Sequence, residues 1–173
     1  MTTTITAPEK SLLPQELHRE IEQFIFKEAL FADESKYSEW EALLDDDMLY
    51  WIPLGDGDYD RGSRMSIAAD NRARVATRIR QLNTGTHHAQ TPPSPMRRML
   101  SNVETYQDGP EEFRAYANFV LYELRSQSNF KLQVWCGRYE YRFRRRNREL
   151  KMFYKKISLV NKEMPLPSIA FII

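Results

Sequence analysis

The chain has 173 residues, 42% of them hydrophobic, and its 25 lysines and arginines nearly balance 24 aspartates and glutamates. This length predicts one globular domain, and a net charge of +1 argues against nucleic acid or an anionic membrane as the partner. The single cysteine, Cys136, excludes a disulfide-stapled secreted domain, so we expect a cytoplasmic protein.

The first third of the chain predicts a short arm and two helices. Residues 1–13 lack the apolar core of a signal peptide and predict a flexible arm, which leaves residues 14–173 as a single domain. Residues 14–33 predict an amphipathic helix, because their apolar side chains recur at spacings of three and four. Residues 36–44 predict a second, shorter helix with Asp33 or Ser35 as its cap.

The stretch GDGDYDRG, residues 55–62, raises the question of a calcium loop. Arg61 stands at the sixth position, where an EF-hand loop has glycine, and Ile67 at the twelfth position cannot coordinate a cation. We therefore expect a solvated loop here. Aspartates do occupy the first, third and fifth positions: Asp56, Asp58 and Asp60.

The order of the remaining elements indicates the fold class. Residues 47–54 predict a strand and residues 66–82 a third helix, and beyond a proline-rich stretch the chain becomes β-rich. Helices followed by long strands predict an α+β fold, with three N-terminal helices packed on a curved, mainly antiparallel sheet. The strands predicted in this second part are residues 97–106, 112–126, 130–145, 150–161 and 168–173.

The strand predicted at residues 130–145 has two different faces. Four aromatic residues alternate along one face, and Cys136 lies on the other. We expect the aromatic face to be covered by helices or by neighbouring protomers, and Cys136 to be an inert small hydrophobe. The four aromatic residues are Trp135, Tyr139, Tyr141 and Phe143.

Histidine spacing does not predict a metal site. The histidines are His18, His87 and His88, and neighbouring residues in an extended segment usually point apart. Zinc ligands on helices are typically three to five residues apart. We expect no metal ion on this chain.

Five arginines crowd into residues 142–148 and could bind phosphate groups. In a hairpin they alternate sides, and the acidic residues elsewhere leave little net field to attract nucleic acid. We expect a solvated hairpin end or a surface for an acidic protein partner.

A cone-shaped sheet closed by helices can also form a pocket in which a buried Asp or His acts as general base beside a tyrosine donor. The candidates for such metal-free chemistry are Asp47, Tyr50, His87 and Tyr37. No spacing rule links them, so a stand-alone pocket enzyme such as an isomerase or dehydratase stays the second hypothesis.

Four stretches, taken in order, carry a resemblance to a known family. They are EIEQFIFKEALFADESKYSEWEALLDDDMLYWIPL, PPSPMRRMLSNVE, WCGRYEYRFRRR and LKMFYKKISLVN. With these stretches the chain resembles the beta (small) subunit of bacterial aromatic-ring-hydroxylating dioxygenases, and the likeness covers nearly everything after the N-terminal arm.

This resemblance implies an NTF2-like cone and assembly into an alpha3beta3 complex, with homotrimeric contacts among beta chains. It places a Rieske [2Fe-2S] cluster and a mononuclear non-haem Fe(II) on the large (alpha) subunit, with NADH or NADPH supplying electrons through ferredoxin or reductase partners. A Rieske centre takes two cysteine and two histidine ligands, whereas this chain has one cysteine. We therefore expect no catalytic, cofactor-binding or metal-binding residues here and a structural, stabilising role.

Overall fold

The computed structural model describes residues 13–55, 65–85, 90–126, 130–162 and 164–173. No helix within these ranges is long and apolar enough to cross a membrane. The helices are α1 (Gln15–Asp33), α2 (Tyr37–Glu41) and α3 (Arg72–Asn83), and the strands are β1 (Leu44–Pro53), β2 (Ser66–Asn71), β3 (Met96–Gly109), β4 (Glu112–Leu124), β5 (Leu132–Arg146) and β6 (Glu149–Leu159).

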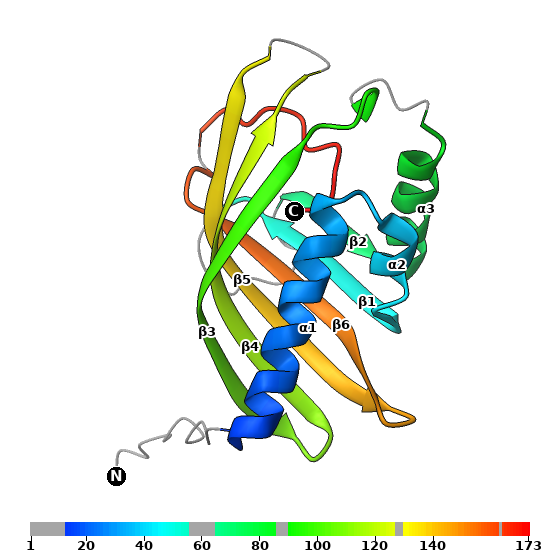
Figure 1. Ribbon diagram of the computed structural model, residues 1–173, viewed down its shortest axis with the longest axis vertical. Helices are drawn as coiled ribbons and strands as arrows, with labels where there is room; N and C mark the ends of the chain where they lie inside the picture. Colours follow the sequence, from blue (N-terminus) through cyan, green and yellow to red (C-terminus); the bar gives the residue numbers. More distant parts are fainter. Residues whose placement is uncertain (1–12, 56–64, 86–89, 127–129, 163) are drawn as a thin grey trace.

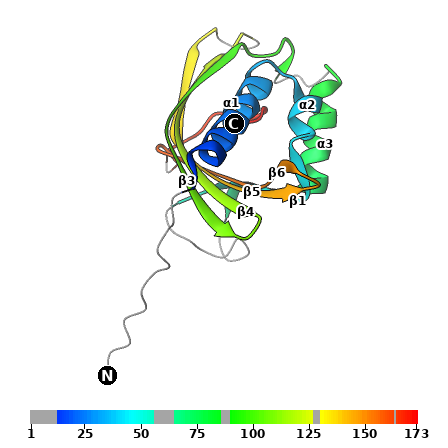
Figure 2. The same ribbon diagram turned by 60° about the horizontal axis from the view of Figure 1, so that its bottom comes forward.

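The strands form one six-stranded sheet in the order β2-β1-β6-β5-β4-β3. β1 runs parallel to β6, and every other neighbouring pair is antiparallel. The register shifts between Ser101 and Glu104 in β3 and between Arg142 and Phe143 in β5, and such bulges bend a sheet. The sheet curves around α1, as Figures 1 and 2 show. This arrangement confirms the predicted α+β fold and its curved, mainly antiparallel sheet.

Three local predictions were wrong. Residues 66–71 form β2 instead of the start of a helix, so α3 follows two strands and the helices do not all precede the sheet. Asn71 ends that strand and caps α3, because its side chain accepts a hydrogen bond from the Arg74 backbone N–H at 3.0 Å. Residues 168–173 form no strand. Helix α2 begins after Lys36 and has no side-chain cap, so neither Asp33 nor Ser35 caps it.

The core lies between α1 and the concave face of the sheet. Ile21 and Ile25 of α1 are fully buried, and Phe24 meets Phe143 edge to face at 5.0 Å between ring centroids. Tyr139 stacks on Phe119 of β4 at 4.0 Å. The predicted aromatic face of β5 is therefore covered by the chain's own elements, since all four of its aromatic residues are 0% exposed: Trp135, Tyr139, Tyr141 and Phe143.

A glycine is required at position 137, where β5 lies close beside β6. A Cβ atom at this position would lie 2.1 Å from the Ser158 backbone oxygen, far inside van der Waals contact. We expect Gly137→Ala to force the two strands apart and lower the free energy of unfolding by about 1–3 kcal/mol. Thermal unfolding measures this loss as a drop in Tm of several degrees. Gly109→Ala is the control, because its Cβ would meet Glu112 at an ordinary 3.5 Å. Equal Tm values for the two variants would contradict the steric account.

Candidate functional site

The interior of the cone holds a fully buried ion pair. Lys155 of β6 donates to Glu28 of α1, with 2.8 Å between Lys155 Nζ and Glu28 Oε1, and both side chains are 0% exposed. Trp40 Nε1 donates to the same carboxylate at 2.5 Å, and the Tyr141 hydroxyl donates to its other oxygen at 3.4 Å. Three donors from α2, β5 and β6 thus converge on one carboxylate of α1, which ties the helices to the sheet.

Burial dominates the electrostatics of this interior. It lowers the pKa of Lys155 to about 8, although the neighbouring Glu28 carboxylate opposes the shift. Burial also raises the pKa of Tyr50 to about 12 and the pKa values of Tyr139 and Tyr141 well above their usual range. These three tyrosines are uncharged at neutral pH.

Residues 171–173 fill the space beside this pair. All three side chains are buried, and the Phe171 ring meets Trp135 edge to face at 5.9 Å. The Tyr50 hydroxyl accepts from the Ile173 backbone N–H at 3.0 Å and lies 3.2 Å from the Ile173 carbonyl oxygen. In Figure 1 the red end of the chain lies between α1 and the sheet. In this structure, the interior that would serve a pocket enzyme is occupied by the chain itself.

Arg98 of β3 also binds the segment of residues 171–173. Its side chain is 0% exposed; its Nε donates to Asp33 Oδ1 at 2.7 Å and its Nη2 to the Ile172 carbonyl at 2.9 Å. Asp33, predicted as a helix cap, thus ends α1 as the partner of a buried arginine. Arg98 Nη1 and the Tyr139 hydroxyl are buried without a hydrogen-bond partner among the described residues.

The residues proposed for acid–base chemistry do not converge. Asp47 faces outward and accepts from Arg144 Nη1 at 2.7 Å, whereas Tyr50 points inward to Ile173. Tyr37 is buried, and burial raises the pKa of its hydroxyl. His87 lies outside the described residues. The described geometry assembles no general base with a tyrosine donor from this set.

The candidate ligands for metals are similarly dispersed. Within the described ranges, no group of three His, Cys, Asp or Glu side chains could hold a metal ion. His18 Nδ1 lies 2.8 Å from Thr105 Oγ1, a contact that joins α1 to β3, and Cys136 is half-buried on the sheet. His88 and the loop predicted to be solvated, with Asp56, Asp58, Asp60 and Arg61, lie outside the described residues.

Arginines of the cluster at the β5–β6 hairpin form ion pairs within the chain. Arg144 contacts Asp47 at 2.7 Å, Arg145 contacts Glu20 at 2.7 Å, and Arg146 contacts Asp45 at 3.3 Å. These pairs neutralise the cations that would attract a phosphate backbone. The hairpin therefore joins β5 to α1 and β1.

Sequence reasoning missed the interior pair, although a signal exists. Glu28 follows Ile21 and Ile25 at spacings of four and three, so a carboxylate stands on the apolar face of α1. Lys155 alternates with Ile157 and Leu159, both buried, on the inward face of β6. One acid and one base at otherwise apolar core positions predict a buried pair.

The outer face of the sheet carries an apolar row. Met99 pairs with Val120, Val120 pairs with Cys136, and the Val160 N–H donates to the Cys136 carbonyl at 3.0 Å. Tyr122 and Val134 pair in the adjacent row. Exposure is 57% for Met99, 42% for Val134 and 75% for Val160. We call these residues the outer apolar patch: Met99, Val120, Tyr122, Val134, Cys136 and Val160.

The raised tyrosine pKa values predict a pH dependence. An unfolded tyrosine loses its proton near pH 10, whereas the buried ones keep theirs, so stability present below pH 10 is lost as pH rises above it. We expect Tyr139→Phe to make this alkaline loss shallower by about 1.4 kcal/mol per pH unit. At pH 7 the variant should be at least as stable, because the hydroxyl has no partner. Denaturant titrations between neutral and alkaline pH measure both effects, and a parallel alkaline loss in the two proteins would contradict the assignment.

Comparisons with known proteins agree with this geometry. The family profile described as "Ring hydroxylating beta subunit" matches residues 27–165. The 3-phenylpropionate/cinnamic acid dioxygenase subunit beta of Photorhabdus laumondii subsp. laumondii is 36% identical over 135 residues, which are 73% of this chain and 74% of that protein.

Solved structures show the same fold. The beta subunit of benzoate 1,2-dioxygenase from Burkholderia mallei superposes with a TM-score of 0.71 at 19% identity, over 95% of this chain and 100% of that one. A naphthalene 1,2-dioxygenase chain gives a TM-score of 0.75 at 15% identity, over 88% of this chain and 83% of that one.

A curved open sheet wrapped around helices, with its interior filled by buried side chains, is an NTF2-like α+β cone. The profile match and the 36% identical relative identify a family within this fold. The chain belongs to the ring-hydroxylating dioxygenase beta subunit family.

Proposed function

We propose that this chain is the non-catalytic small subunit of a Rieske-type oxygenase whose large subunit inserts oxygen into an aromatic ring. One observation carries the proposal: the cone interior, where an enzyme of this shape would bind substrate, is filled by the Glu28–Lys155 pair and by residues 171–173. Membership of the ring-hydroxylating beta subunit family supports this role, because a subunit with a filled interior can act as part of a larger oxygenase complex. The single domain, residues 14–173, acts in the cytoplasm as an assembly element.

The redox centres belong to the large subunit in this proposal. A Rieske cluster takes two cysteine and two histidine ligands, and one cysteine in 173 residues does not fit it. A mononuclear non-haem iron needs two histidines and a carboxylate converging on one point, and no such group exists among the described residues. Electrons from NADH or NADPH reach those centres through ferredoxin or reductase partners.

The outer face of the sheet is the surface that we propose for contacts between subunits. We assign the outer apolar patch to contacts between beta chains in an alpha3beta3 complex. Its core row crosses β3, β4 and β5 and reaches the end of β6, a width of about 15 Å at the usual strand spacing. Exposed apolar patches rimmed by polar residues mark protein interfaces. Outside the patch, Arg138 on this face is paired with Glu104 at 3.1 Å.

The assembly proposal is tested by placing a charge in the patch. We expect Val134→Asp to convert the trimer of this chain into monomers, because a carboxylate buried in an apolar contact has no partner. Sedimentation equilibrium measures the change. Asn118→Asp is the matched control, since Asn118 pairs with Arg138 on the same face outside the patch. A Val134→Asp chain that stays trimeric would place the contact elsewhere.

A further inference from the structure

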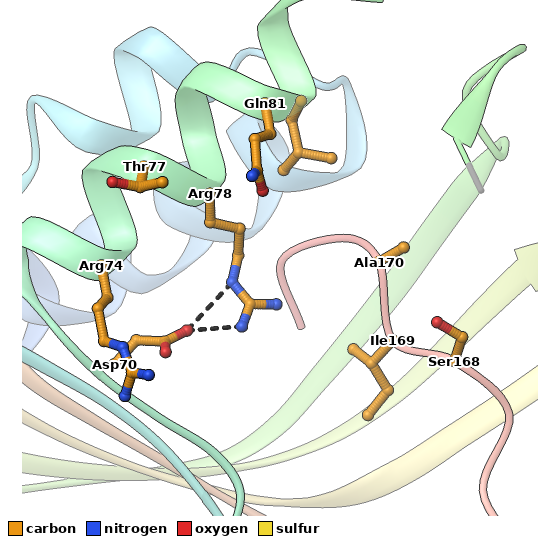
Figure 3. Close-up of a pocket in the computed structure, with 9 residues that line it drawn as sticks. Asp70, Arg74, Thr77, Arg78, Gln81, Ser168, Ile169 and Ala170 are labelled. Carbon is orange, nitrogen blue, oxygen red and sulfur yellow. Dashed lines mark hydrogen bonds and ion pairs between the residues drawn. The ribbon is translucent and has the colours of Figure 1, made fainter. Parts of the chain in front are cut away.

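A polar groove separates α3 from the segment that leads to the buried residues 171–173. It has a volume of about 400 Å³. Figure 3 shows Arg78 and Gln81 extending from α3 toward one side of the groove, with Ile169 and Ser168 on the other. Its lining combines two arginines with one aspartate and includes Asp70, Arg74, Arg78, Gln81, Ser168 and Ile169.

The cations of the groove are only partly neutralised. Arg78 donates to Asp70 Oδ2 at 2.6 Å through Nη2 and at 3.1 Å through Nε. Arg74 is exposed, and its guanidinium has no acidic partner among the described residues. Arg80, two residues beyond Arg78 and outside the groove lining, donates to the Thr77 hydroxyl and has no carboxylate partner among the described residues. The groove therefore presents the positive charge of Arg74, which no acidic residue of the described chain neutralises.

This pattern differs from that of the other arginine-rich part of the chain. At the β5–β6 hairpin, Arg144, Arg145 and Arg146 each contact an acidic residue of the same chain. Helix α3 contains four arginines and no acidic residue, and among the described residues only Arg72 and Arg78 of the four have carboxylate partners. Unpaired cations beside a groove of hydrogen-bond donors are suited to carboxylates supplied by another molecule.

We propose that the α3 groove binds an acidic segment of the large oxygenase subunit, an assignment that rests on the proposed function. The position of the groove allows it: α3 packs against β1 and β2, whereas the outer apolar patch lies on the opposite face of the sheet, mainly on β3, β4 and β5. In Figure 2, α3 lies beside β1 and away from β3 and β4. Contacts between small subunits thus leave the groove open to the large subunit.

The test measures binding of the purified large subunit to the small-subunit trimer over a range of ionic strength. We expect Arg74→Glu and Gln81→Glu each to weaken binding about tenfold at low salt and to flatten its salt dependence. Arg19→Glu is the control, because Arg19 is an exposed arginine of α1 and its charge change is the same as that of Arg74→Glu and larger than that of Gln81→Glu. Both groove variants are surface changes, so circular dichroism and the trimer mass should match the wild type.

Each outcome decides the assignment. Groove variants that bind as tightly as Arg19→Glu, with the same salt dependence, would overturn it while leaving the proposed function intact. A wild-type trimer that binds no large subunit would overturn the proposed function, and the groove assignment with it.

Discussion

Lys155→Ala lowers the free energy of unfolding by about 3–5 kcal/mol in our account of the interior, the cost of breaking a buried ion pair. The carboxylate of Glu28 is 0% exposed and would remain without its cation. The hydrogen bonds from Trp40 and Tyr141 remain, but neither donor carries a charge. Urea denaturation at pH 7 measures the loss.

Two further variants isolate the charge effect. Glu28→Gln combined with Lys155→Met removes both charges, and we expect it to recover most of the lost stability because no unpaired ion remains. Lys151→Ala is the surface control, since its pair with the exposed Glu149 is worth at most about 1 kcal/mol. A double variant as unstable as Lys155→Ala alone would contradict the electrostatic explanation.

Trp135→Ala has the second large effect, a loss of about 3–5 kcal/mol. The indole is 0% exposed, packs edge to face on Phe171, and donates through Nε1 to Glu123 Oε2 at 3.0 Å. The substitution leaves a cavity beside residues 171–173 and removes one donor from Glu123, a buried carboxylate that Ser94 also contacts. In a domain of this size, the expected fall in Tm is about 2–4 °C for each kcal/mol.

A conservative replacement separates packing from hydrogen bonding. Trp135→Phe keeps an aromatic ring but loses the N–H, so we expect a smaller loss than for alanine. Because Trp135 lies inside the chain's own core, the folded fraction of either variant should keep the wild-type oligomeric state. An unchanged Tm for Trp135→Ala would contradict the placement of this side chain.

Regular elements were predictable wherever side-chain periodicity was clear. Helix α1 and strands β3 to β6 match their expected positions within a few residues, because apolar residues recur with helical or alternating spacing. The strand predicted at residues 168–173 was wrong, because an apolar run in the sequence is the same whether the segment pairs in a sheet or fills the core without pairing. Its backbone groups at Ile172 and Ile173 bond to side chains of Arg98 and Tyr50 instead of a neighbouring strand.

The interior was less predictable than the fold. Glu28 lies on α1, whereas Arg98 and Lys155 lie on β3 and β6, and only the folded sheet brings these two cations near the helix. Opposite the step from Arg142 to Phe143, β6 has one extra residue, Phe153, and this bulge shifts the alternation of β6, so that Met152 and Lys155 both face inward at odd spacing. The outer apolar patch depends on strand register, which sequence alone does not give.

The most direct test of the central claim is the iron and acid-labile sulfide content of each chain in the native complex. Our account predicts that this chain purifies with a second, larger subunit and that all the iron and sulfide remain with that subunit once the chains are separated. A metal-free chain recovered alone, with turnover of its own, would contradict the claim.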